Sequence, residues 1–107
     1  MSTTLLSSPL QGFTDFRFRN AFQKYSPYIR LNGKMEIKPA YEKDILRKNN
    51  DTLEVIPQIM TNDADDFLFV AKYVQSLGYK ELNWNLGCPY PMVVNRCMGS
   101  GLISDAN

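Results

Sequence analysis

A strand-helix-strand unit in the second half of the chain limits its possible folds more than any other feature. Residues 53–60 are mostly apolar and predict a buried strand. The apolar residues that follow recur at spacings of three and four: Phe67, Val70, Ala71, Val74 and Leu77. This pattern predicts a helix that Asn62 or Asp63 caps and Gly78 ends, followed by a short strand over residues 81–86. A helix between two such strands favours a parallel α/β sheet with a right-handed crossover.

The first half of the chain predicts the same kind of architecture in less detail. Residues 3–9 are short and apolar and predict a buried strand, and residues 16–25 have the spacing of an amphipathic helix. Residues 28–37 contain a second possible strand, interrupted around Asn32-Gly33, while residues 40–50 have a mixed pattern that predicts no definite element. Periodicity alone fits either a doubly wound sheet or a (β/α)8 barrel.

The composition is that of a soluble globular protein long enough for one small domain. The chain has 107 residues, of which 44% are hydrophobic and 21% charged. Its net charge of +1 gives no electrostatic reason to expect nucleic acid, a membrane or an acidic partner. No segment approaches the roughly 20 apolar residues that span a bilayer, and the amino terminus lacks the basic flank of a signal peptide. We therefore expect a cytoplasmic protein without a membrane segment.

The absence of histidine narrows the chemistry available to these residues. Without it, the chain has neither a Ser-His-Asp nor a Cys-His catalytic unit, and Cys88 and Cys97 alone are too few ligands for a structural zinc site. A disulfide between the two cysteines is disfavoured in a reducing compartment. Any reaction must therefore use Cys, Asn, Gln, carboxylates or a cofactor.

Polar side chains stand where the expected strands end, which is the edge at which α/β barrels place their functional groups. Gln58 lies near the end of one strand, and Asn83 and Asn85 lie on the next with two-residue spacing. This spacing puts both asparagines on one face of the strand and turns Trp84 towards the packing helices. A single strand-end amide most often satisfies loop backbone groups. A flavin ring offers another partner, since its pyrimidine edge carries both donors and acceptors.

Cys88 follows these amides in the turn Gly87-Cys88-Pro89. A free cysteine is often a small buried hydrophobe, but a tight turn at a strand end can present the sulfur to a ligand instead. Thiols are mostly protonated at neutral pH, so such a group can act as a general acid. Cys97 has no comparable setting, and we expect it to be structural. Arg96 belongs either to the solvated surface or to a contact with a phosphate or an RNA backbone.

Three segments together resemble the tRNA-dihydrouridine synthase family. They are residues 8–15 (SPLQGFTD) with Phe18-Arg19, residues 55–59 (VIPQI), and residues 81–89 (ELNWNLGCP) with residues 99–102 (GSGL). The resemblance implies a (β/α)8 TIM barrel that binds FMN, followed by a smaller helical domain. It also implies an enzyme that reduces the C5=C6 bond of a uridine in tRNA with NADPH.

The resemblance also implies roles for individual residues. Pro9 and Leu10 match positions against the flavin, Gln58 matches the flavin-binding glutamine, and Asn85 matches an asparagine beside flavin and substrate. Cys88 matches the proton donor, so reduced flavin would deliver hydride to C6 while the thiol protonates C5 of a base turned out of its stack. Cys97 departs from the family, which commonly has glycine there.

A complete barrel needs about 250 residues, so residues 1–107 would supply roughly its first four strands. The rest of the barrel and the helical domain would then lie beyond Asn107. Two alternatives stay open. One is another FMN barrel of the dihydroorotate dehydrogenase type, and the other is a non-catalytic fragment that acts as an interaction module.

Overall fold

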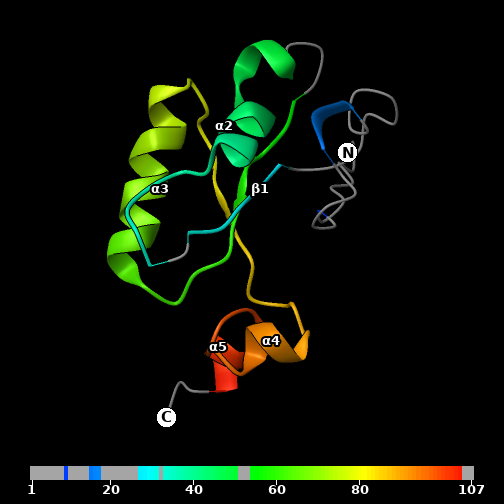
Figure 1. The fold of residues 1–107 in the computed structure, drawn as a ribbon, viewed down its shortest axis with the longest axis vertical. Helices are drawn as coiled ribbons and strands as arrows, with labels where there is room; N and C mark the ends of the chain where they lie inside the picture. The colour runs from blue at the N-terminus through cyan, green and yellow to red at the C-terminus, as the bar shows by residue number, and fades with distance from the viewer. Residues whose placement is uncertain (1–8, 10–14, 18–26, 32, 51–53, 105–107) are drawn as a thin grey trace, which may run out of the picture.

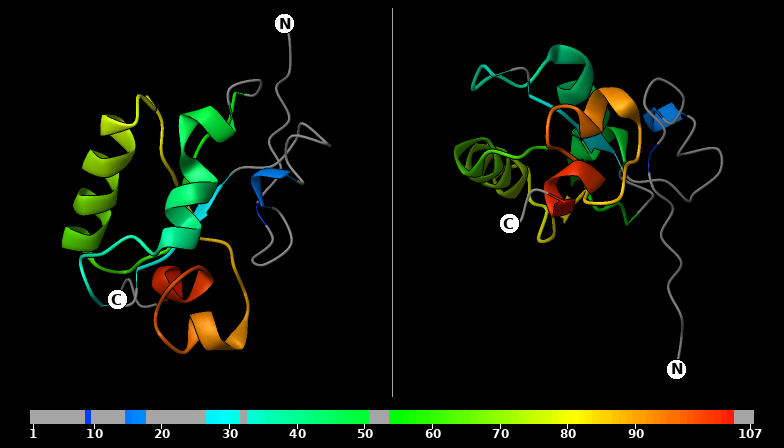
Figure 2. Two further views of the ribbon diagram at one scale, coloured as in Figure 1. Left: turned by 45° about the horizontal axis from the view of Figure 1, so that its top comes forward. Right: turned by 90° about the horizontal axis from the view of Figure 1, so that it is seen from below.

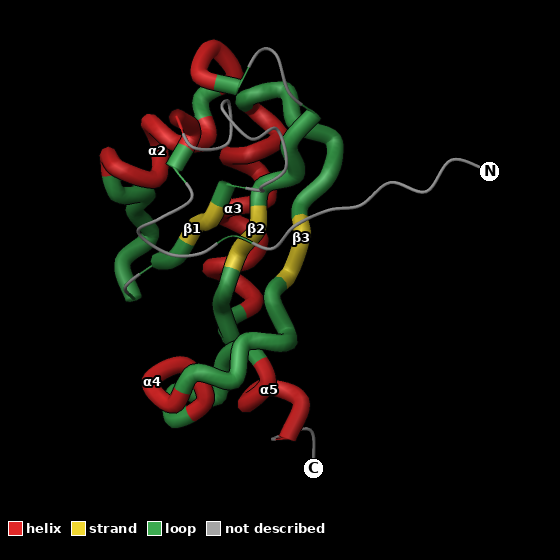
Figure 3. Tube along the Cα trace, turned by 90° about the vertical axis from the view of Figure 1, so that its right-hand side faces the viewer, coloured by secondary structure: helices red, strands yellow, loops and turns green. Residues whose placement is uncertain are grey.

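The computed structural model describes residues 9, 15–17, 27–31, 33–50 and 54–104, and it contains a parallel three-stranded sheet. The strands are β1 (Tyr28–Ile29), β2 (Gln58–Ile59) and β3 (Asn83–Trp84), in the order β1-β2-β3. Figure 3 shows them side by side. The predicted parallel α/β organisation is therefore confirmed for this part of the chain.

The register of the sheet sorts its side chains onto two faces. Gln58 pairs with Tyr28 and Asn83, whereas Ile59 pairs with Ile29 and Trp84. Since side chains alternate along a strand, the Ile59 row faces one side of the sheet and the Gln58 row faces the other.

The paired strands are shorter than the sequence predicts. The predicted strands 53–60 and 81–86 each have a paired core of two residues. The Gln58 N–H bonds the Pro27 carbonyl at 2.7 Å, whereas Pro57, which has no N–H, contributes only its carbonyl, which accepts from the Asn83 N–H at 2.8 Å. Residues 3–8 and most of the predicted helix 16–25 lie outside the described residues, although Phe16 and Arg17 are helical.

Several helices accompany the sheet. They are α2 (Pro39–Ile45), the 3-10 helix η1 (Arg47–Asn49), α3 (Ala64–Ser76), α4 (Pro91–Val94) and α5 (Ser100–Ser104). Figures 1 and 2 show α2 and α3 side by side. Helices α4 and α5 lie together beyond the carboxyl ends of β2 and β3. None of the described helices has the length and apolar character needed to cross a membrane.

Helix α3 follows its sequence signals closely. The side chain of Asp63 caps it by accepting a hydrogen bond from the Asp66 N–H at 2.9 Å. At the other end Gly78 has a φ of 88°, and its N–H bonds the Gln75 carbonyl at 2.9 Å. Glycine suits this left-handed position because it has no Cβ, and the chain turns there directly towards β3.

The main core lies between the Ile59 face of the sheet and the helices α2 and α3. Its buried members are Ile29, Leu31, Ile45, Val55, Ile59, Val70, Val74 and Tyr79. The Tyr79 hydroxyl donates to the Ile45 carbonyl at 2.8 Å, which ties the start of the segment leading to β3 to the end of α2. A second, smaller cluster of Met60, Val93 and Met98 lies beyond the strand ends, with Cys88 packed against it.

Candidate functional site

Three amide side chains meet on the Gln58 face of the sheet. Gln58 Nε2 donates to Asn83 Oδ1 at 2.8 Å, and Asn85 Nδ2 donates to Gln58 Oε1 at 2.9 Å. We call Gln58, Asn83 and Asn85 the amide cluster. The parallel register brings them together, because it sets Gln58 directly opposite Asn83. The prediction that Asn83 and Asn85 share one face is confirmed.

The three side chains of the amide cluster differ in their exposure to solvent. Gln58 is only 5% exposed, Asn85 is half-buried and Asn83 is exposed. On the opposite face, the Trp84 ring lies 5.3 Å from Phe67 of α3, and its indole N–H donates to the Thr61 carbonyl at 3.0 Å. The predicted orientation of Trp84 towards the helices is confirmed, so β3 has one helix-facing side and one amide side.

The amide cluster is bonded directly to the backbone at Cys88. Asn85 Oδ1 accepts from the N–H of Gly87 at 3.1 Å and from the N–H of Cys88 at 3.0 Å. This side-chain turn folds residues 85–88 back on themselves at the end of β3. Cys88 is half-buried, and its side chain packs against the cluster of Met60, Val93 and Met98.

The Cys88 carbonyl is held from the other side by the start of α5. It accepts from the Ser100 N–H at 3.1 Å and from Ser100 Oγ at 3.0 Å. Gly99 makes this approach possible, because a Cβ at that position would lie 2.7 Å from the Cys88 carbonyl oxygen. The sequence predicted no role for Gly99 or Ser100, although the segment GSGL contributed to the family resemblance.

Cys97 occupies an unusual backbone conformation. Its φ is 51°, in the left-handed region that favours glycine, just after α4 ends. This geometry explains why a glycine is favoured at the position that Cys97 fills. Both cysteines are free thiols, and no group of metal-ligating side chains is found among the residues that the structure describes.

Arg96 is exposed and lines a separate hollow near the strand ends. The hollow has a volume of about 490 Å³, and its lining includes Arg30, Met60 and Arg96 together with the carboxylates of Asp63, Asp65 and Asp66. Partial burial raises the pKa of Asp66, and the negative charges of Asp63 and Asp65 raise it further. The hollow thus presents both signs of charge, and a phosphate contact by Arg96 stays a prediction.

The remaining predicted site residues lie at the amino-terminal end of the chain. Pro9 is half-buried, and its position against a flavin stays a prediction. Leu10 lies outside the described residues. The structure therefore brings together Gln58, Asn85 and Cys88 and leaves the other predicted contacts as expectations.

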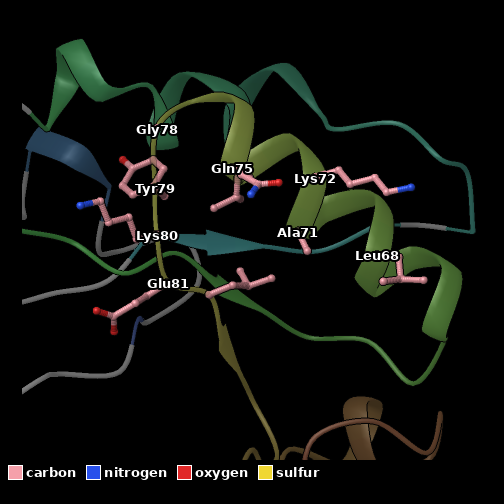
Figure 4. Close-up of a pocket in the computed structure, with 10 residues that line it drawn as sticks. Leu68, Ala71, Lys72, Gln75, Gly78, Tyr79, Lys80 and Glu81 are labelled. Atoms are coloured by element: carbon pink, nitrogen blue, oxygen red, sulfur yellow. The ribbon is translucent and has the colours of Figure 1, made fainter.

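The amide cluster does not lie in the groove beside α3. This groove has a volume of about 660 Å³ and runs between α3 and the segment that leads to β3. Figure 4 shows Leu68, Ala71 and Lys72 on the helix side and Lys80 and Glu81 on the other. No residue of the amide cluster lines the groove, and neither does Cys88.

Comparison with known proteins gives a consistent set of relatives. The tRNA-dihydrouridine(20/20a) synthase of Haemophilus ducreyi is 31% identical over 94% of this chain and 32% of its own length. Probable tRNA-dihydrouridine synthases of Helicobacter pylori and Rickettsia bellii are 27% and 23% identical over 96% and 98% of the chain. The chain spans about a third of the length of these relatives. No solved structure matches it.

The family comparison covers nearly all of the sequence. A family model described as dihydrouridine synthase (Dus) matches residues 5–107. The matched range includes the amide cluster, the turn at Cys88 and the Gly99-Ser100 segment that contacts it. On this match the chain belongs to the dihydrouridine synthase family.

Proposed function

We propose that this chain is the amino-terminal part of an enzyme that reduces the C5=C6 bond of uridine in tRNA, with FMN as its cofactor and NADPH as its reductant. The complete enzyme is then a (β/α)8 TIM barrel with a carboxyl-terminal helical domain, and residues 1–107 supply its first four strands. The observation that carries the proposal is the bonded connection from Gln58 through Asn85 to Cys88 at one edge of a parallel sheet.

The amide cluster has the chemistry to hold FMN. Each primary amide has two donor hydrogens and a carbonyl acceptor. Gln58 Nε2 uses one hydrogen on Asn83, and Asn85 Nδ2 uses one on Gln58, so each of these two nitrogens keeps a second hydrogen. Unused donors beside a buried amide fit the pyrimidine edge of the flavin ring, which carries carbonyl oxygens and ring nitrogens. When bound, FMN supplies hydride transfer.

In this proposal Cys88 is the proton donor. Its backbone is fixed at the N–H by Asn85 and at the carbonyl by Ser100, so the thiol is attached to a rigid support. The thiol gives its proton to C5 of the uracil. Asn85 is suited to contact both FMN and the base, because it lies between Gln58 and Cys88.

The other residues of the site complete the proposal. Pro9 and Leu10 pack against the flavin ring, and Arg96 contacts the phosphate backbone of the tRNA. The target base lies within folded RNA, so it must leave its stack to reach Cys88.

Replacement of Cys88 by alanine in the complete enzyme tests the proposal. Reduction of bound FMN by NADPH needs no proton from Cys88, so it should proceed at the wild-type rate. Reoxidation by unmodified tRNA should slow at least about 100-fold, the lower end of what general acid catalysis contributes. Anaerobic stopped-flow absorbance follows the two half-reactions separately.

Cys97→Ala is the matched control, because it removes the other thiol and keeps a Cβ at the same left-handed position. Both half-reactions should be close to wild type in this variant. Wild-type reoxidation by Cys88→Ala, or loss of bound flavin from it, would remove Cys88 from the role of proton donor.

A further inference from the structure

The orientation of the Asn85 amide follows from its backbone partners alone. The N–H groups of Gly87 and Cys88 both point at one end of this amide, at 3.1 and 3.0 Å. A backbone N–H only donates, so the end that faces them must be the oxygen. The Asn85 nitrogen must therefore face Gln58.

This constraint passes along the whole amide cluster. Asn85 donates to Gln58, so the accepting atom of Gln58 must be its oxygen, at 2.9 Å. The Gln58 nitrogen therefore faces Asn83. Asn83 in turn accepts at 2.8 Å through its oxygen, which leaves its NH₂ group facing away. Exchanging oxygen and nitrogen in any one amide would place two donors or two acceptors against each other.

We propose that Asn83 is a positioning residue that locks the Gln58 amide in this orientation, so that the site presents mainly donor hydrogens to its ligand. The inference rests on the function proposed above and adds the reason for Gln58's orientation. Asn83 anchors the exposed end of the amide cluster, as the Cys88 turn anchors the other. Without Asn83, nothing among the described residues holds the Gln58 nitrogen.

The orientation selects the chemical class of the ligand. One donor hydrogen remains on the Gln58 nitrogen and one on the Asn85 nitrogen, whereas Asn85 Oδ1 already accepts two bonds. The excess of donors matches a ring edge with carbonyl oxygens, as in a flavin or a uracil. An edge that offers only N–H groups would leave the donors of the site unpaired, at the cost of buried polar groups without partners.

A double-mutant cycle on the complete, flavin-stripped enzyme tests the inference, with FMN as the probe and isothermal titration calorimetry as the readout. Asn83→Ala and Gln58→Ala should each weaken FMN binding, on the order of 10-fold. The double variant should be no weaker than Gln58→Ala, because Asn83 acts through Gln58. Asn62→Ala, which removes an exposed amide bonded to the Arg96 carbonyl, is the control and should bind FMN like wild type.

Two further variants make the test specific. Asn83→Asp keeps an acceptor for Gln58 Nε2, so the interaction between residues 83 and 58 should remain. Gln58→Ala should then weaken FMN binding in the Asn83→Asp background as much as it does in the wild type. Gln58→Glu keeps the size of the side chain but replaces the donor by an acceptor, and it should weaken FMN binding at least as much as Gln58→Ala.

Each outcome decides the matter. Additive losses in the cycle, or wild-type affinity in Gln58→Glu, would overturn the inference and leave the proposed function standing. Failure of the wild-type complete enzyme to bind FMN would overturn both.

Discussion

At the residue scale, Cys88 shows how the fold fixes a turn through backbone bonds at both ends of one residue. The Cys88 N–H bonds a side chain of β3, and the Cys88 carbonyl bonds Ser100 of α5 twice. The thiol takes no part in these backbone bonds, and the Cys88 side chain packs against the cluster of Met60, Val93 and Met98.

Gly99→Ala in the complete enzyme tests the contact between residues 99 and 88. The new Cβ would lie 2.7 Å from the Cys88 carbonyl oxygen and 3.0 Å from Cys88 Cβ, so the Cys88 turn must shift. We expect a loss of about 1–3 kcal/mol in the free energy of unfolding and slower flavin reoxidation by tRNA. Urea denaturation and stopped-flow absorbance measure the two effects.

Gly33→Ala is the matched control for this clash. Gly33 also has a positive φ, of 69°, but its added Cβ would meet nothing within 4 Å. Gly33→Ala therefore introduces the backbone strain of a positive φ without a steric clash of the new Cβ. Equal losses in the two variants would show that the approach of Gly99 to Cys88 is unimportant.

Alternation along β3 was enough to predict which residues share a face. It correctly grouped Asn83 with Asn85 and turned Trp84 to the helices. The pairing with Ser100 was missed, because a contact between residues 88 and 100 depends on how α4 and the following turn fold back. No periodicity in the sequence encodes that path.

At the element scale, α2 and α3 are joined by a hydrogen bond as well as by the core. The Tyr73 hydroxyl of α3 donates to Glu42 Oε1 of α2 at 3.0 Å. Burial raises the pKa of Tyr73, and the bond to Glu42 together with its negative charge raises it further. The folded protein therefore favours the neutral phenol.

This bond predicts a loss of stability in alkali. Because the pKa of Tyr73 is raised on folding, its contribution is present below about pH 10 and is lost as the pH rises through the folded pKa. In the complete enzyme, Tyr73→Phe should be less stable than wild type at about pH 8, and the difference should shrink at about pH 11. Urea midpoints at the two values measure it.

Tyr90→Phe is the control, since Tyr90 is 60% exposed. It should follow wild type at both pH values. A constant difference between Tyr73→Phe and wild type would mean that the phenol proton is not involved.

The sequence predicted these elements unevenly, for physical reasons. Helix α3 carries a full set of signals, namely an apolar stripe, the Asp63 cap and the Gly78 stop, and it was predicted almost to the residue. Helix α2 was missed, because its seven residues bury only Ile45 and so show little periodicity. Its one clear signal was Pro39, which suits the first turn of a helix.

At the scale of the whole molecule, the described sheet has unpaired edges. Within the described residues β1 and β3 each pair with β2 alone. Several large apolar side chains are also exposed: Met35, Leu68, Trp84, Tyr90, Met92 and Ile103. Open strand edges and exposed apolar surface both favour association with another chain.

We therefore expect residues 1–107, expressed alone, to self-associate or to unfold readily, whereas in the proposed complete barrel further strands and helices would cover these surfaces. Size-exclusion chromatography with light scattering and a thermal melt distinguish the two. A monomer with a sharp thermal transition would contradict the proposal that these residues are the first half of a barrel.

Trp84 can serve as an intrinsic fluorescence probe of β3. It is the chain's single tryptophan, and it lies on β3 between Asn83 and Asn85. Its indole N–H and ring are both engaged, so its surroundings depend on the position of that strand. The intrinsic tryptophan emission of these residues therefore comes from one known point, directly behind the face on which the amides meet.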